Sequence, residues 1–150
     1  GRLVAMYSRH SSDRKTYWRI SAAWDFSRWD SEQVLEHPGS GNVTYSNLYS
    51  LETEQGPLLL NFLRWIAWNP TVMVSTDQGQ SWTQGGRLIR AEGQNLVRPY
   101  VQYRSDGQRV IFVTTDGHPR DVDTSFVAGT SAAGSRPAGQ CRRPGTPARC

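Results

Sequence analysis

The chain has 150 residues, enough for a hydrophobic core, and it carries a net charge of +4 with only one lysine, Lys15, among its 17 basic residues. The basic residues are dispersed and no recognition helix is predicted, which argues against a nucleic-acid binder. No apolar run approaches the roughly 20 residues of a membrane-spanning helix, so we expect no membrane insertion. An arginine-rich surface suits carboxylate or phosphate ligands, and it equally fits a gene of high GC content.

The first third of the chain predicts short β-strands. Residues 3–9 and 16–21 are rich in β-branched and aromatic side chains and predict two strands, which a polar loop joins. Residues 22–30 predict a hairpin, and residues 31–35 predict an outer strand after it.

The middle third predicts four strands in succession, at residues 44–51, 58–65, 70–75 and 86–90. Turn-forming residues separate the first two of them. No convincing amphipathic helix is predicted anywhere in the chain.

The last third begins with strands predicted at residues 98–104 and 109–115, joined by the Asp-Gly turn at Asp106. From Ser125 onward the chain consists mostly of Ala, Gly, Ser, Pro and Arg, with almost no strand former. We therefore expect a low-complexity tail over residues 124–150, either disordered or produced by a frameshift, and no third or fourth strand after the last pair.

Prominent residues recur at a fixed spacing. His10, Arg64 and His118 are separated by 54 residues each, and so are Tyr49 and Tyr103. Each of the residues His10, Arg64 and His118 is predicted to close the second strand of one repeat unit. A period of this length with four strands per unit is typical of propeller blades.

The stretch Ser75–Trp82 reads S-x-D-x-G-x-x-W, and each fixed letter suits a tight hairpin. Asp77 can accept hydrogen bonds from nearby backbone N–H groups, Gly79 can adopt a positive φ, and Trp82 can cover the turn. This stretch resembles the Asp box, or BNR repeat, of sialidase-like β-propellers, in which the motif closes a blade and usually contacts no substrate. Residues 22–30 resemble a degenerate copy without the glycine.

Repeat and resemblance together predict the architecture. The expected fold is all-β, a fragment of a seven-bladed β-propeller with four-stranded antiparallel blades. We expect the partial propeller to cover residues 1–123, with an incomplete first blade, a complete blade at 44–90 and half a blade at 98–120. Such a fragment is expected to be inactive alone.

In a propeller, the loops between the second and third strands of each blade lie on the same face as the residues at which the first strands begin. Polar and aromatic residues gather at these predicted positions, so we expect a binding site there. They are His10, Tyr45, Arg64, Trp65, Asn69, Arg98, His118 and Arg120.

Five short segments resemble a BNR-repeat family of bacterial and fungal propellers that includes ulvan lyases and enzymes acting on rhamnose–glucuronate linkages. The segments are residues 8–10, 44–47, 68–70, 98–101 and 115–120. The resemblance implies a secreted or periplasmic protein that acts on a polysaccharide or oligosaccharide containing uronic acid.

In a lyase of this kind the catalytic residues would be His10, Tyr45 and Arg64. Arg64 would offset the uronate charge, His10 would take the proton, and Tyr45 would donate to the leaving oxygen, or act as the base if Arg64 lowers its pKa. The predicted substrate-binding residues are Trp65, Asn69, Arg98, His118 and Arg120.

Two other functions stay open at this point. One is a glycoside hydrolase of the rhamnosidase or sialidase type, although Asp13, Asp116 and Asp121 are the only acids near the expected face. The other is a non-catalytic glycan-binding propeller. No cofactor or metal is predicted, and no carboxylate cluster indicates a structural calcium ion.

Overall fold

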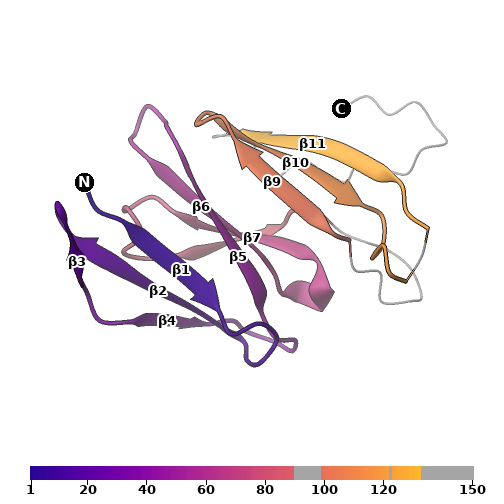
Figure 1. Cartoon of the computed structure of the whole chain (residues 1–150), viewed down its shortest axis with the longest axis horizontal. Coiled ribbons are helices and arrows are strands. Elements are labelled where there is room, and N and C mark those ends of the chain that lie inside the picture. Colours follow the sequence, from indigo (N-terminus) through magenta and orange to yellow (C-terminus); the bar gives the residue numbers. More distant parts are fainter. Residues whose placement is uncertain (90–98, 122, 133–150) are drawn as a thin grey trace.

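The computed structural model describes residues 1–89, 99–121 and 123–132. Within these ranges the chain is all-β, as predicted, with eleven strands in three antiparallel sheets and one short 3-10 turn. The three sheets follow one another along the long axis of the molecule (Figure 1). The described part of the chain contains no helix that is long and apolar enough to cross a membrane.

The first sheet is built on β2 (Lys15–Ala22). On one side β2 pairs with β1 (Val4–Ser8), and on the other it pairs with β3 (Asp25–Trp29) near its end and with β4 (Gln33–Glu36) near its start. Because β3 and β4 pair with successive parts of β2, they act as one interrupted edge strand. The outer strand predicted at 31–35 is β4, which begins at Gln33 and pairs with β2, and the hairpin predicted at 22–30 contains β3.

The second sheet is a four-stranded antiparallel meander in chain order. Its strands are β5 (Thr44–Leu51), β6 (Leu58–Arg64), β7 (Pro70–Ser75) and β8 (Thr83–Arg87). The number and order of the strands are as expected, and β8 starts three residues before the predicted position. The 3-10 turn Ile66–Trp68 joins β6 to β7.

The third sheet has β10 (Arg109–Thr115) between β9 (Val101–Ser105) and β11 (Phe126–Ala132). The expectation that no strand follows residue 123 was wrong, because β11 pairs with the whole length of β10. The small residues that made this stretch resemble a low-complexity tail have a packing reason. Gly129 lies opposite Phe112, and a Cβ at Gly129 would lie 2.5 Å from Phe112 Cζ.

Apolar side chains fill the two interfaces between the sheets. Between the first and second sheets the buried cluster comprises Trp18, Ile20, Val43, Leu59, Leu63, Trp65, Met73 and Trp82. Between the second and third sheets it comprises Leu51, Leu60, Phe62, Val72 and Val110. The second sheet is thus covered on both faces, which explains the nearly continuous apolar sequence of β6.

The 54-residue spacing does not mark equivalent positions in the folded chain. Tyr49 Oη donates to the backbone oxygen of Tyr103 at 2.9 Å, and the two rings lie 6.4 Å apart in the same interface. Equivalent residues of successive sheets would point the same way and would not meet. Only Arg64 ends a strand, because β1 stops two residues before His10 and β10 stops three residues before His118.

The turn at Ser75–Trp82 is a dense network of hydrogen bonds. Asp77 Oδ1 accepts from the Ser75 hydroxyl at 2.8 Å and from the Ser81 backbone N–H at 2.9 Å, while Asp77 Oδ2 accepts from the Ser81 hydroxyl. These hydrogen bonds lower the pKa of Asp77 to about 2, and the two from Ser81 have the largest effect. Gly79 has φ +87, and a Cβ there would lie 3.1 Å from a methyl group of Val4 in the first sheet. The turn therefore closes one sheet and packs against its neighbour.

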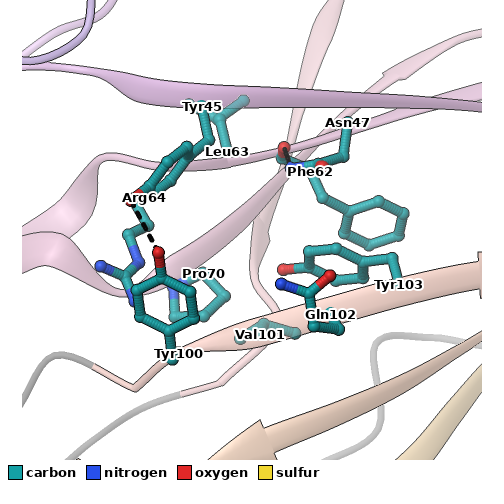
Figure 2. A pocket seen from close by; sticks show the side chains of 10 residues that line it. All are labelled: Tyr45, Asn47, Phe62, Leu63, Arg64, Pro70, Tyr100, Val101, Gln102 and Tyr103. Carbon is teal, nitrogen blue, oxygen red and sulfur yellow. Dashed lines mark hydrogen bonds between the residues drawn. The ribbon is translucent and has the colours of Figure 1, made fainter. Parts of the chain in front are cut away.

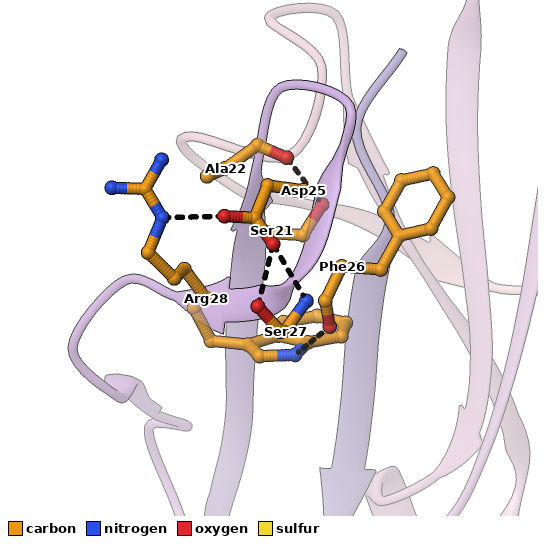
Figure 3. A network of polar contacts seen from close by, with 7 residues as sticks. Ser21, Ala22, Asp25, Phe26, Ser27 and Arg28 are labelled. Atoms are coloured by element: carbon orange, nitrogen blue, oxygen red, sulfur yellow. Dashed lines mark hydrogen bonds and ion pairs between the residues drawn. The ribbon is translucent and has the colours of Figure 1, made fainter.

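The turn between β2 and β3 uses a different network (Figure 3). Asp25 accepts from the Ser27 backbone N–H at 3.1 Å and from its hydroxyl at 2.6 Å, and it pairs with Arg28 at 2.6 Å. Ser21 bonds the backbone of Ala22 instead of Asp25, at 3.0 Å. Here the aspartate bonds residues two and three positions ahead of it, whereas Asp77 bonds Ser81, four positions ahead.

Candidate functional site

Four aromatic rings from all three sheets form a row at one end of the strands. His10 follows β1, Tyr45 belongs to β5, Tyr100 precedes β9 and His118 follows β10. Their centroids are 5.4 Å apart for His10 and Tyr45, 6.4 Å for Tyr45 and Tyr100, and 5.2 Å for Tyr100 and His118, all in edge-on geometry. We call these four residues the aromatic row.

A β-bulge places Tyr45 at the centre of the row. Thr44 pairs with Arg64 and Asn47 pairs with Phe62, so two residues of β5 lie opposite one residue of β6. Tyr45 has φ +64, a left-handed conformation that costs a non-glycine residue about 1–3 kcal/mol and that is most frequent at functional sites. The bulge lets Tyr45 contact a ring of the first sheet on one side and a ring of the third sheet on the other.

Arg64 lies beneath the two tyrosines of the row (Figure 2). Its guanidinium carbon is 5.5 Å from the centroid of Tyr45 and 5.0 Å from that of Tyr100, within the range of cation–π attraction. It is 8% exposed and donates a hydrogen bond to the backbone oxygen of Pro99. Arg64 therefore contacts the row from its buried side. The sequence predicted that its guanidinium group binds a carboxylate directly.

The two tyrosine hydroxyls lie 3.4 Å apart (Figure 2). The hydrogen bond with Tyr100, followed by burial and by the charge of Tyr100, raises the pKa of Tyr45, and the opposing effect of Arg64 is smaller. Tyr45 is therefore a neutral phenol at neutral pH and a hydrogen-bond donor. This differs from the expected alternative in which Arg64 lowers the pKa of Tyr45.

Each histidine of the row has a fixed ring nitrogen. His10 Nδ1 lies 2.7 Å from the hydroxyl oxygen of Thr44, which is buried. His118 Nδ1 accepts the backbone N–H of Arg120 at 3.1 Å, so the neutral ring of His118 carries its proton on Nε2. Both rings thus keep Nε2 available to a ligand.

The cavity beside Tyr45, Arg64 and Tyr100 is small. Its volume is about 100 Å³, against roughly 300–1,000 Å³ for a typical ligand pocket. Tyr45 and Tyr100 beside the cavity are 39% and 36% exposed.

Other residues predicted for the site lie elsewhere. Trp65 is buried in the core with its ring 4.6 Å from that of His37, so it cannot stack on a ligand from solvent. Asn69 is also buried and donates to the backbone oxygen of Ile66 at 2.9 Å, which fixes the 3-10 turn.

Two predicted residues remain, Arg98 and Arg120. Arg120 is exposed and pairs with Asp121 at 3.0 Å. Arg98 lies outside the described residues. The sequence did not single out Tyr100, although it lies within one of the segments that carry the family resemblance, residues 98–101.

The described residues contain no group of three or more His, Cys, Asp or Glu side chains that could hold a metal ion. Comparison of the chain with protein-family models and with curated proteins finds no match. The geometry of the aromatic row therefore carries the functional argument.

Proposed function

We propose that the three sheets are blades of a sialidase-like β-propeller. The support is the four-stranded meander of β5 to β8, the face-to-face stacking of three sheets and the Asp-box turn at Ser75–Trp82. In such a fold one end of the strands forms the usual ligand-binding face, and the aromatic row lies at one such end.

We further propose that this end binds a glycan containing uronic acid and cleaves it by β-elimination. The observation that carries the proposal is the aromatic row above Arg64. Tyr45 and Tyr100 offer exposed ring edges and hydroxyl groups to a sugar, and the guanidinium beneath them provides a permanent positive charge. A polysaccharide substrate of this kind implies a protein that acts outside the cytoplasm.

The reaction needs three things from these residues. A base takes the proton from the carbon next to the carboxylate, the electron pair forms the new C=C bond, and the bond from the adjacent carbon to the glycosidic oxygen breaks. The leaving oxygen then receives a proton. Positive charge near the carboxylate stabilises the carbanion-like transition state.

Two groups of the row can act as the base. One is the imidazole of His10, and the other is the phenolate of Tyr45. Because the pKa of Tyr45 is raised, a lyase that uses the phenolate would become more active toward alkaline pH. His10, Arg64 and Tyr100 are the titratable or charged groups that contact Tyr45 in the described structure.

Hydrolysis has less support from the acidic residues. Asp13 accepts from the Tyr17 hydroxyl at 2.7 Å and from the Lys15 backbone N–H at 3.0 Å, and Asp116 accepts from the Ser125 backbone N–H at 3.1 Å. Asp121 pairs with Arg120 at 3.0 Å, so each of the three candidate acids already has polar partners of its own. Non-catalytic glycan binding is the second candidate, because two partly exposed tyrosines beside a very small cavity also suit a surface that binds a sugar without cleaving it.

The test is to incubate the full-length gene product with ulvan and with glucuronate–rhamnose oligosaccharides while following the ultraviolet absorbance of an unsaturated uronate. We expect the absorbance to rise with wild type and the rate to fall roughly 100-fold or more in Tyr45→Phe. Tyr7→Phe, which changes a tyrosine of the first sheet outside the row, is the matched control and should keep the rate.

The products separate the candidates. Release of free rhamnose without an absorbance change would indicate a hydrolase. Binding without either product would indicate the non-catalytic candidate, and absence of both binding and products would refute a glycan function for this end.

A further inference from the structure

The hydroxyl of Thr44 has a single hydrogen-bond partner in the described structure, His10 Nδ1 at 2.7 Å. Thr44 is 3% exposed and follows the buried Val43, so its hydroxyl is largely removed from solvent. His10 itself is exposed, and only its Nδ1 side is held. The direction of this one hydrogen bond therefore decides which ring nitrogen of His10 carries the proton.

Hydrogen-bond accounting selects the direction. If Nδ1 carried the proton and donated it to Thr44, the threonine hydroxyl proton would have no acceptor, and a buried unpaired donor is unfavourable. If Thr44 donates to Nδ1, both the hydroxyl proton and the nitrogen lone pair are satisfied at once. The proton of the neutral imidazole then resides on Nε2, which faces away from Thr44.

We infer that Thr44 is a positioning residue that fixes His10 as a neutral Nε2–H donor, and that this N–H binds a carboxylate oxygen of the uronate. The inference rests on the proposed function for the identity of the ligand. His118 has the same tautomer for an independent reason, since its Nδ1 accepts the Arg120 backbone N–H. The aromatic row thus has an imidazole N–H donor at each end and two phenols between them.

This assignment changes the roles within the proposed reaction. An Nε2 that carries a proton cannot take another one, so His10 binds the carboxylate and the proton next to it goes to the oxygen of Tyr45. Tyr45 must first lose its own proton to solvent, after which it can return the abstracted proton to the leaving oxygen. Elimination would then speed up as the pH rises through the alkaline range.

The direct test is ¹⁵N NMR of the imidazole rings in the full chain, which has only three histidines. His10→Gln assigns the His10 signals by their disappearance. In wild type we expect the proton correlation on Nε2 and an Nδ1 resonance shifted by an accepted hydrogen bond. Thr44→Ser should keep this pattern, while Thr44→Val should move the Nδ1 resonance toward the value of a free imidazole.

Two outcomes would overturn the positioning role. One is a proton on Nδ1 of His10 in wild type, and the other is a Thr44→Val spectrum in which the His10 signals are unchanged. If the valine variant fails to fold, the position of the proton on wild-type His10 still decides, because a proton on Nδ1 contradicts the inference.

Titration with sodium glucuronate tests the ligand separately. A shift of the His10 Nε2–H signal that is at least several-fold smaller in Thr44→Val supports carboxylate binding, and no shift in wild type refutes it. Because the tautomer is measured without any sugar, a failure of the proposed lyase function leaves a different signature from a failure of the positioning role.

Discussion

The Asp-box turn offers the sharpest test of how this chain is stabilised. Asp77→Ala removes a carboxylate that accepts three hydrogen bonds from Ser75 and Ser81. A pKa of about 2 in the folded chain, against 3.8 in a model peptide, corresponds to roughly 2 kcal/mol of folding free energy. Because the turn is only half-buried, solvent screening reduces this to about 1 kcal/mol. The hydrogen bonds from Ser75 and Ser81 cause the pKa shift, so their contribution is already included in this value.

We therefore expect Asp77→Ala to lower the free energy of unfolding by about 1 kcal/mol and Tm by roughly 2–4 °C. The assay is urea unfolding at several pH values, with Thr76→Ala, an exposed residue of the same turn, as the control. The folded-state pKa is depressed, so the charge contributes fully above about pH 4 and its contribution is lost as the pH falls through about 2. Equal midpoints for the two variants at pH 7, or a difference that does not shrink in acid, would refute the reasoning.

Two further predictions concern the packing of the sheets. Gly129→Ala places a methyl group against the ring of Phe112, so β11 should detach from β10 at a cost of about 1–3 kcal/mol. The measurement is amide hydrogen exchange, which should become faster in residues 126–130. Ala128→Ser changes an exposed residue of the same strand and should leave the exchange unchanged. Burial lowers the pKa of His37, whose Nε2 forms a hydrogen bond with the Thr16 hydroxyl at 2.8 Å. The free energy of unfolding should therefore decrease as the pH falls below about 6.5, because the unfolded chain binds a proton at this residue more readily. His37→Gln should flatten this pH dependence in thermal melts. A slope that survives in His37→Gln would assign the effect to another group.

The candidate site was only partly predictable from the sequence. His10, Tyr45, Arg64 and His118 were predicted to share one end of the strands, and the structure places them there. Trp65 was misplaced because a residue directly after a strand can point either to solvent or to the core, and the 3-10 turn Ile66–Trp68 directs it inward. Tyr100 was missed because its neighbours in the row lie far from it along the chain, Tyr45 in the second sheet and His118 after β10, and no local pattern reports such contacts.

Local chemistry explains what the sequence determined alone. Alternating apolar residues, the Asp-Gly turn at Asp106 and the motif at Ser75–Trp82 specify strands and hairpins through contacts among near neighbours, so the all-β class and the four-stranded meander were predictable.

Tertiary packing decided the rest. It paired β11, rich in small residues, with β10, because Gly129 leaves room for Phe112, and it brought Tyr49 and Tyr103 together in one interface although their spacing predicted equivalent positions. In a β-strand a one-residue change of register moves every side chain to the opposite face. Which residues meet therefore depends on the lengths of the connections and on how the sheets stack, and neither can be read from one segment of the chain.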